Sequence, residues 1–222
     1  MRIFISRALT DKSPFGSMLQ QYTLQGLSLI DFEPIAFESP VEVDWLFFYS
    51  KNGIKYFFEQ QPKLTQLPLI GVIGSASARY LDQRYGIKAD FIGTGAPETT
   101  AEQFLAVAQT KNIVFVQAQN SKQSIQKLLG EAVLSQNLIV YNNYPKRDFE
   151  IATADILVFT SPMNVTAYFS RYVLQPFQQI VSIGKTTAAA LEQQGMTNYF
   201  IAASPNEKGL ATTCLNLINN KL

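Results

Sequence analysis

The chain of 222 residues contains no histidine and a single cysteine, Cys214. Without histidine, catalysis by a Ser-His or Cys-His pair and a histidine-ligated metal site are excluded. A single cysteine also excludes a disulfide within the chain and a cysteine-rich zinc site. Cys214 falls in an apolar helical pattern over Leu210–Leu217, which predicts a small buried hydrophobic side chain rather than a reactive thiol.

Charged residues are scarce as well, at 16%, against about 25% in an average soluble domain. The net charge of +1 argues against a general nucleic-acid binder, which would show a basic face. Apolar residues make up 47% of the chain, which is enough for a core and too much for disorder. No apolar run approaches the roughly 18 residues of a membrane span, and the N-terminus lacks a signal-peptide pattern. We therefore expect a cytoplasmic protein without membrane association.

The sequence repeats itself with a period of about 111 residues. Val43–Ser50 aligns with Ala154–Ser161, and Gly71–Ser77 aligns with Val181–Thr187. Each copy alternates near-continuous apolar runs, which are typical of parallel strands buried on both faces, with helical stretches. The predicted fold class is α/β, with two flavodoxin-like three-layer domains that each contain a parallel sheet.

Glycines predict several helix ends, namely those at Gly26, Gly86, Gly130 and Gly195. In the first copy, the strand after the helix that ends at Gly26 is predicted over Ser28–Phe32.

Two extended stretches that contain proline, Glu33–Val41 and Asn143–Phe149, each follow the second strand of a copy. If both cross between domains, the copies are swapped. Residues 1–34 and 150–222 then form one discontinuous domain, residues 40–143 form the other, and the linkers lie near 35–39 and 144–149. A simple split near residue 110 fits the periodicity equally well.

Small hydroxyl residues stand where the apolar runs of both copies turn into helices. Ligands of open α/β sheets bind outside the carboxyl ends of the strands, and the free N–H groups of a helix start attract anions. Serine and threonine are also ordinary N-caps, so the duplicated set is more informative than any single member. The small hydroxyl residues and glycines at these strand ends are Ser50, Gly74, Ser75, Ser77 and Thr94 in the first copy, and Ser161, Gly184, Thr186, Thr187 and Ser204 in the second.

Arg7 and Tyr141 also follow or end predicted strands. Arg7 faces either an anion or solvent, and Tyr141 is either a functional phenol or an aromatic side chain packed at a linker. The Asp and Glu residues show no spacing that suits a hard metal ion.

Several short motifs occur in a defined order along the chain. The segment Ile183–Leu191 is followed by Gly195, Ala203-Ser204-Pro205 and Gly209-Leu210, and Val158–Pro162 is followed by Val165. Ser6-Arg7 follows the first strand, and Val140-Tyr141 precedes the second linker. In this order and spacing, the motifs resemble the uroporphyrinogen-III synthase family over the whole chain.

The resemblance implies two swapped α/β domains joined by a two-stranded linker, with the active site in the cleft. It implies a monomer that needs no metal and no cofactor, binds no nucleic acid and makes at most a transient contact with the preceding deaminase. The implied substrate is hydroxymethylbilane, a linear tetrapyrrole with many carboxylates. Cyclisation to uroporphyrinogen III, in haem biosynthesis, inverts the last pyrrole ring and releases water.

By the same resemblance, Tyr141 would assist departure of the hydroxide. Ser50, Ser77, Ser161, Thr186 and Thr187 would hold the substrate with their neighbouring amides, and Arg7 would contribute charge.

The sequence departs from the family at Lys185, where proline is usual, and at Ala118, where glycine is common. These departures favour one alternative, a non-catalytic relative that binds a tetrapyrrole or another polyanion as a sensor or regulator. A second alternative is a two-lobed binding protein of the periplasmic type, against which the missing signal peptide speaks.

Overall fold

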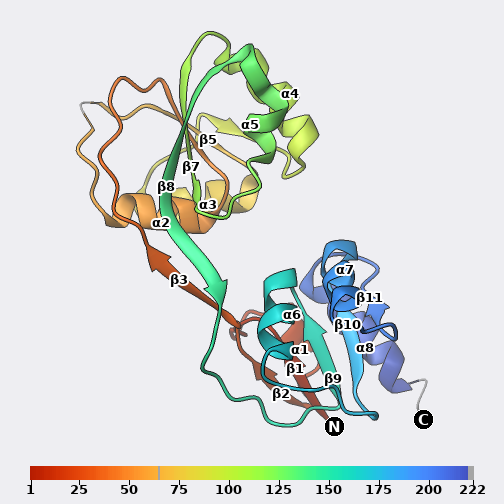
Figure 1. The fold of residues 1–222 in the computed structure, drawn as a ribbon. Coiled ribbons are helices and arrows are strands. Elements are labelled where there is room, and N and C mark those ends of the chain that lie inside the picture. The colour runs from red at the N-terminus through yellow and green to blue at the C-terminus, as the bar shows by residue number, and fades with distance from the viewer. Residues whose placement is uncertain (65, 220–222) are drawn as a thin grey trace. The chain divides into compact units, whose positions relative to one another are not determined.

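A computed structural model describes residues 1–64 and 66–219 (Figure 1). The chain divides into two compact units. Unit 1 contains Met1–Asp31 and Tyr144–Leu222, and unit 2 contains Phe32–Asn143. The chain therefore crosses between the units near residues 31 and 144 and not near residue 110. Residues 220–222 of the segment expected over 150–222 lie outside the described residues.

Unit 1 contains a parallel sheet, which has five strands in the order β11-β10-β9-β1-β2 over the described residues. Numbered along the chain within the unit, this order is the 2-1-3-4-5 arrangement of flavodoxin-like sheets. The elements are β1 (Arg2–Ile5), α1 (Pro14–Met18), β2 (Thr23–Gly26), β9 (Ile156–Phe159), α6 (Pro162–Phe169), β10 (Gln179–Ser182), α7 (Lys185–Gln193), β11 (Phe200–Ile201) and α8 (Glu207–Asn219).

Unit 2 contains the second sheet, in the order β3-β8-β7-β4-β5-β6. Strands β8, β7, β4, β5 and β6 pair in parallel and repeat the order of unit 1, with β4 in the place of β9 and β7 in the place of β1. The duplicated, swapped α/β fold is thus confirmed. The elements are β3 (Ile30–Pro34), β4 (Trp45–Phe48), α2 (Lys51–Glu59), β5 (Leu69–Val72), α3 (Ser75–Tyr85), β6 (Phe91–Ile92), α4 (Pro97–Ala108), β7 (Asn112–Ala118), α5 (Ser124–Leu129), a 3₁₀ turn (Gly130–Ala132) and β8 (Leu134–Pro145).

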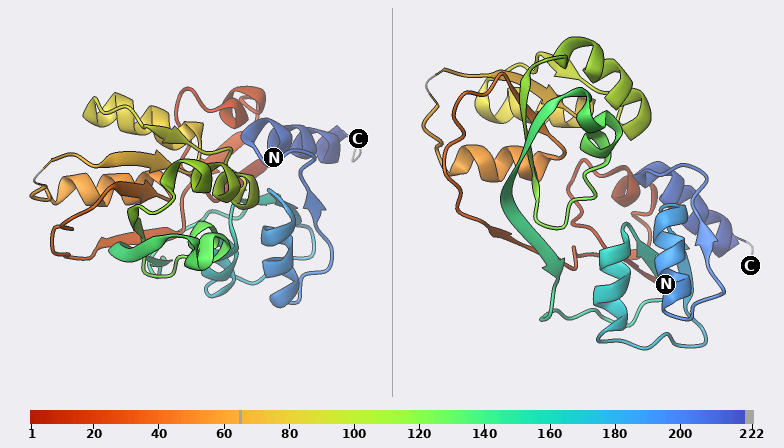
Figure 2. Two further views of the ribbon diagram at one scale, coloured as in Figure 1. Left: turned by 90° about the horizontal axis from the view of Figure 1, so that it is seen from above. Right: turned by 45° about the horizontal axis from the view of Figure 1, so that its top comes forward.

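Each sheet has an apolar core on both of its faces, because successive residues of a strand point to opposite sides. In β4, Leu46 and Phe48 pack with residues of α2 and α3, whereas Trp45 and Phe47 pack with residues of α4 and α5. Phe4 of β1 likewise faces α6 and α7, and its neighbours in the strand face α1 and α8. The helices on the two sides of the sheets can be followed in Figure 2. This alternation explains why the strands are continuous apolar runs in the sequence.

Strands β3 and β8 lie side by side where the chain crosses between the units, and they run in opposite directions (Figure 1). The amide of Ile35, just after β3, donates to the carbonyl of Val140 in β8 at 3.0 Å. Of the linkers expected near 35–39 and 144–149, the first follows the end of β3 at Pro34, and the second begins as strand, since β8 continues to Pro145. None of the helices within residues 1–64 and 66–219 is long and apolar enough to cross a membrane.

The helix end predicted at Gly26 is wrong. The strand predicted over Ser28–Phe32 is partly right, because residues 30–32 belong to β3, but the second strand of the unit 1 sheet lies earlier, at Thr23–Gly26. Gly26 is the last residue of β2 and pairs with Ile5 of β1. A Cβ at Gly26 would lie 2.6 Å from Cγ of Leu9 and 2.8 Å from the carbonyl oxygen of Arg7, so glycine serves a close approach here. By contrast, Gly86 and Gly130 end α3 and α5 with positive φ values of 68° and 54°, as predicted.

Candidate active site

In each unit the two central strands send their connections to opposite faces of the sheet. In unit 2, β4 leads to α2 on one face and β7 leads to α5 on the other. In unit 1, β9 leads to α6 and β1 leads to α1, again on opposite faces. Such pairs are the topological switch points of open α/β sheets, where ligands bind at the carboxyl ends of the strands.

At the switch point of unit 2, Ser50 caps helix α2. Its backbone is extended, with φ −160° and ψ 163°, and its Oγ accepts a hydrogen bond from the amide of Gly53 at 3.0 Å. Ser161 caps α6 in the same way in unit 1, with φ −164° and ψ 159°. Both serines are therefore N-caps, and a site role for either would come in addition to capping.

Tyr141 of β8 lies beside Ser50. Its hydroxyl oxygen is 3.1 Å from Oγ of Ser50, and its side chain is 6% exposed. Burial raises the pKa of Tyr141, the hydrogen bond with Ser50 lowers it, and the neighbouring Tyr56 raises it, so the pKa stays above its ordinary value. The phenol is consequently protonated at neutral pH and can act as a hydrogen-bond donor.

The backbone around Tyr141 is irregular in a way that sets its position. The register between β7 and β8 shifts at this point, with Gln117 opposite Ile139 and Ala118 opposite Tyr141. The amide of Gln119 donates to the carbonyl of Tyr141 at 2.9 Å. A bulge of this kind changes the direction of a side chain within a strand.

The helices that follow β5 and β10 begin without a side-chain cap. Gly74 and Gly184 are the N-caps of α3 and α7, and no side chain accepts a hydrogen bond there. Thr186 is exposed in the first turn of α7, and a Cβ built at Gly184 would meet no atom within 4 Å. The first amides of these helices are therefore available to an anion.

Ser77 and Thr187 occupy equivalent third positions of α3 and α7, and both are buried. Their amides donate to the carbonyls of Gly74 and Gly184 at 3.0 and 3.1 Å. Among the predicted substrate-binding residues, Thr186 is thus the more accessible of the two threonines.

Arg7, after β1, forms an ion pair that the sequence did not predict. Its Nη1 lies 3.0 Å from Oε1 of Glu207, in the first turn of α8, and its side chain is 41% exposed. Glu207 also accepts hydrogen bonds from the hydroxyl of Ser13 and the amide of Phe15. Burial raises the pKa of Glu207, but these hydrogen bonds and the charge of Arg7 outweigh burial and hold it below its usual range.

A family model described as uroporphyrinogen-III synthase HemD matches residues 27–212. The chain belongs to this family. A uroporphyrinogen-III synthase of Chlorobaculum parvum is 24% identical over 221 residues, with 87% of this chain and 89% of that protein covered. Membership places the chain among the hydro-lyases of tetrapyrrole biosynthesis.

Solved structures of the same family share the fold. Uroporphyrinogen-III synthetase of Helicobacter pylori has a TM-score of 0.77 at 21% identity, covering 98% of this chain and all of that one. A mutant uroporphyrinogen III synthase of Thermus thermophilus has a TM-score of 0.57 at 17% identity and is covered completely, as is this chain.

One further polar residue of this family member was missed by the sequence reasoning. Asn164 is 2% exposed; its Nδ2 donates to Oγ of Ser161 at 2.8 Å, and its Oδ1 accepts from the amide of Leu29 at 2.8 Å. The only local signal was a glycosylation sequon, Asn164-Val165-Thr166, which says nothing about a buried amide.

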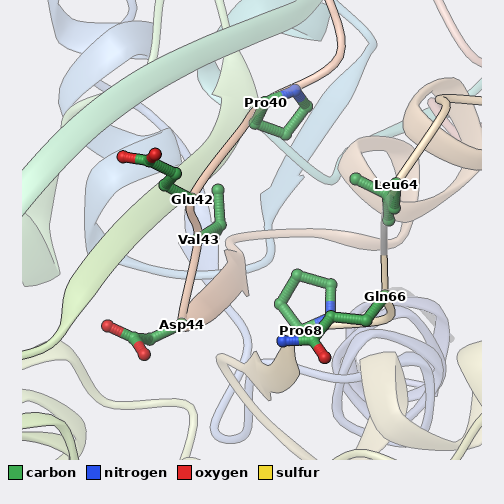
Figure 3. Close-up of a pocket in the computed structure, with 7 residues that line it drawn as sticks. All are labelled: Pro40, Glu42, Val43, Asp44, Leu64, Gln66 and Pro68. Carbon is green, nitrogen blue, oxygen red and sulfur yellow. The ribbon is translucent and has the colours of Figure 1, made fainter.

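A pocket of about 460 Å³ lies at the opposite end of the unit 2 strands (Figure 3). Asp44 directly precedes β4, and Pro68 directly precedes β5. Among the described residues, the lining of this pocket includes two acidic side chains and no basic one. Such a lining does not suit a substrate that carries many carboxylates. The residues that line it are Pro40, Glu42, Val43, Asp44, Leu64, Gln66 and Pro68. Within residues 1–64 and 66–219, no three His, Cys, Asp or Glu side chains gather so that they could hold a metal ion.

Proposed function

We propose that this protein cyclises hydroxymethylbilane to uroporphyrinogen III, with Tyr141 as the residue that assists the loss of water. The observation that supports this assignment is the pairing of the Tyr141 hydroxyl with Oγ of Ser50, 3.1 Å apart, at the switch point of unit 2. A buried, protonated phenol beside the start of a helix is suited to donate a hydrogen bond to a leaving group.

The first chemical step breaks the C–O bond of the terminal hydroxymethyl group. The nitrogen lone pair of the adjoining pyrrole expels the hydroxyl group, and the pyrrole loses its N–H proton to give a neutral azafulvene. Tyr141 donates a hydrogen bond to the leaving oxygen or transfers its proton to it. The N–H proton completes the balance, by joining the hydroxide to form water or by restoring the phenol. Because the pKa of Tyr141 is raised, the side chain adds no negative charge beside the substrate carboxylates. The Gly53 amide donates a hydrogen bond to Oγ of Ser50 and so orients the Ser50 hydroxyl beside the phenol.

The second stage is the closure that inverts the last ring. The far ring attacks the azafulvene carbon through its already substituted position, the resulting spiro intermediate fragments, and the macrocycle recloses. Without an enzyme the substrate closes to the symmetric type I isomer. The protein must therefore hold a flexible chain in the geometry of the hindered closure, which is an entropic task and requires no histidine.

Carboxylate binding falls to helix starts and hydroxyl groups. The uncapped first turns of α3 and α7 offer backbone amides, and Thr186 adds an exposed hydroxyl beside one of them. Donors of this kind, oriented before the substrate arrives, stabilise anions without a basic surface. Ser77 and Thr187 lie within these first turns, and Ser161 caps the start of α6. Arg7 contributes a cation that Glu207 holds in place.

An isomer assay tests this function. Hydroxymethylbilane is generated freshly by a deaminase, the folded protein is added, and the oxidised porphyrins are separated by chromatography. We expect type III in excess over a control without protein. Type I alone would overturn the enzymatic assignment and favour the non-catalytic tetrapyrrole binder. The cytoplasmic location, the monomeric state and the transient contact with the deaminase stay predictions.

A further inference from the structure

The ring of Tyr141 is held by two other aromatic rings. Tyr56 of α2 stacks on it, with centroids 5.3 Å apart and ring planes 22° from parallel. Phe32 of β3 lies tilted against it at 6.2 Å. Since Tyr141 also ends the regular pairing of β7 with β8, its backbone alone does not determine where the hydroxyl points.

Tyr56 belongs to the same helix that Ser50 caps. Long side chains on a helix lean toward its N-terminus, so Tyr56, in the second turn of α2, covers the first turn. The ring of Tyr56 and the Oγ of Ser50 thus reach Tyr141 from one rigid element, one against its face and the other against its hydroxyl. Lys55 lies over the Tyr56 ring at 4.9 Å and helps to fix it.

We propose that Tyr56 is a positioning residue for the reaction: its ring stacks on Tyr141 and directs the Tyr141 hydroxyl toward the departing group. The proposal rests on the proposed function, because it gives Tyr56 a role only through Tyr141. The ring of Tyr56 is what matters for stacking, and its hydroxyl is not required.

A double-mutant cycle separates positioning from general packing. We expect Tyr56→Leu to lower kcat about tenfold with little change in KM, and Tyr56→Phe to keep activity within about twofold. In a Tyr141→Phe background, where no hydroxyl is left to direct, Tyr56→Leu should cost nothing further. Full additivity of the two changes would overturn the proposal, as would wild-type kcat in Tyr56→Leu.

Phe58→Leu is the matched control. Phe58 is a half-buried aromatic residue of the same helix, but it packs on Phe48 and Tyr85 and not on Tyr141. We expect this variant to lose stability comparable to Tyr56→Leu, by thermal melting, and to keep kcat. An equal loss of kcat in both variants would mean that helix packing, not the Tyr141 contact, sets the rate.

A second readout does not depend on activity. With 3-fluorotyrosine incorporated, the fluorine resonance of position 141 is assigned as the one that Tyr141→Phe removes. We expect Tyr56→Leu to shift and broaden this resonance and Phe58→Leu to leave it in place. An unmoved resonance in Tyr56→Leu would overturn the positioning role even if the isomer assay had failed, and a moved resonance would support the stacking geometry. The fate of the proposed function is read separately, from type III formation by the wild type.

Discussion

Gly53 of unit 2 and Asn164 of unit 1 occupy the same position of the duplicated fold, three residues after the serine that caps their helix. Both amides donate to the capping Oγ, at 3.0 Å from Gly53 and 3.3 Å from Asn164. In unit 1, Nδ2 of the Asn164 side chain also donates a hydrogen bond to Oγ of the capping Ser161, at 2.8 Å. In unit 2, Gly53 has no side chain, and Oγ of the capping Ser50 contacts the hydroxyl of Tyr141 instead. One repeat thus uses the cap for structure, and the other makes it a contact of the phenol.

Tyr141→Phe tests the phenol directly. The change removes one hydroxyl, and Ser50 keeps its bond to the Gly53 amide, so stability should change by less than about 1 kcal/mol. We expect kcat for type III formation to fall at least tenfold, since a positioned proton donor typically contributes about 10²-fold or more. Tyr144→Phe, on the same strand, is the control and should keep full activity. Wild-type turnover in Tyr141→Phe would show that the phenol has no chemical role.

Asn164→Ala tests the closed cap of unit 1. The change leaves the Leu29 amide without its 2.8 Å acceptor in a buried place, so we expect a loss of about 1–3 kcal/mol in unfolding free energy. Urea denaturation measures this. The exposed Thr166→Ala in the same helix should stay within about 0.5 kcal/mol of wild type. Similar values for both variants would contradict a special role for the Asn164 amide.

Thr186→Ala should affect substrate binding, whereas Thr187→Ala should affect stability. Thr186 is exposed at the uncapped start of α7, so its loss should raise KM for hydroxymethylbilane up to about tenfold and leave the melting temperature unchanged. Thr187 is buried, so its loss should lower stability by about 1 kcal/mol. Steady-state kinetics and thermal melts of the pair check this. Unchanged kinetics in Thr186→Ala would leave that residue without a part in substrate binding.

Glu207→Gln tests the ion pair with Arg7 through pH. The pKa of Glu207 is lowered in the folded protein from its ordinary value of 4.5. Its ionised form therefore stabilises the fold fully above pH 4.5, and this contribution is lost as the pH falls through the lowered folded pKa. We expect the variant to be less stable at neutral pH by about 0.5–1 kcal/mol, and the difference to shrink in acid. Urea denaturation from pH 7 down to about pH 3.5 measures it. A stability difference between wild type and Glu207→Gln that does not change with pH would show that the charge of Glu207 does not stabilise the fold.

Cys214 provides a probe of opening. Its thiol is buried in the core under α8, and burial raises its pKa to about 12. We expect no reaction with a disulfide reagent in native buffer and a complete reaction in urea, because the thiolate is the reactive form. Thiol absorbance assays follow both. Fast labelling of the native protein would contradict the packing of α8.

The sequence was sufficient for the fold class, because the central strands are buried on both faces and therefore read as apolar runs. It misplaced β2 for the same reason. Thr23–Gly26 lies at an edge of its sheet, paired to β1 alone among the described strands, and is only half-buried. Because β2 is rich in polar residues, it shows no apolar run, and the strand was predicted in the more apolar Ser28–Phe32 that follows.

The site was predictable only where chemistry follows local sequence. Ser50 and Ser161 could be placed because a residue that ends a strand and starts a helix has few possible positions. The ion pair of Arg7 with Glu207 joins residues 200 positions apart, and no local pattern announces it. The stack of Tyr56 on Tyr141 also joins residues far apart in sequence, and Tyr141 lies at the register shift between β7 and β8.

The swapped connection also sets an order of events during translation. Ile3 of β1 pairs with Ile156 of β9, so β1, one of the two central strands of the unit 1 sheet, leaves the ribosome long before its neighbour β9. At 5–20 residues per second, the wait for about 150 residues lasts on the order of ten to thirty seconds. All strands of the unit 2 sheet emerge within that time. The nascent chain therefore completes its middle first, while β1 waits with an apolar edge that a chaperone can cover.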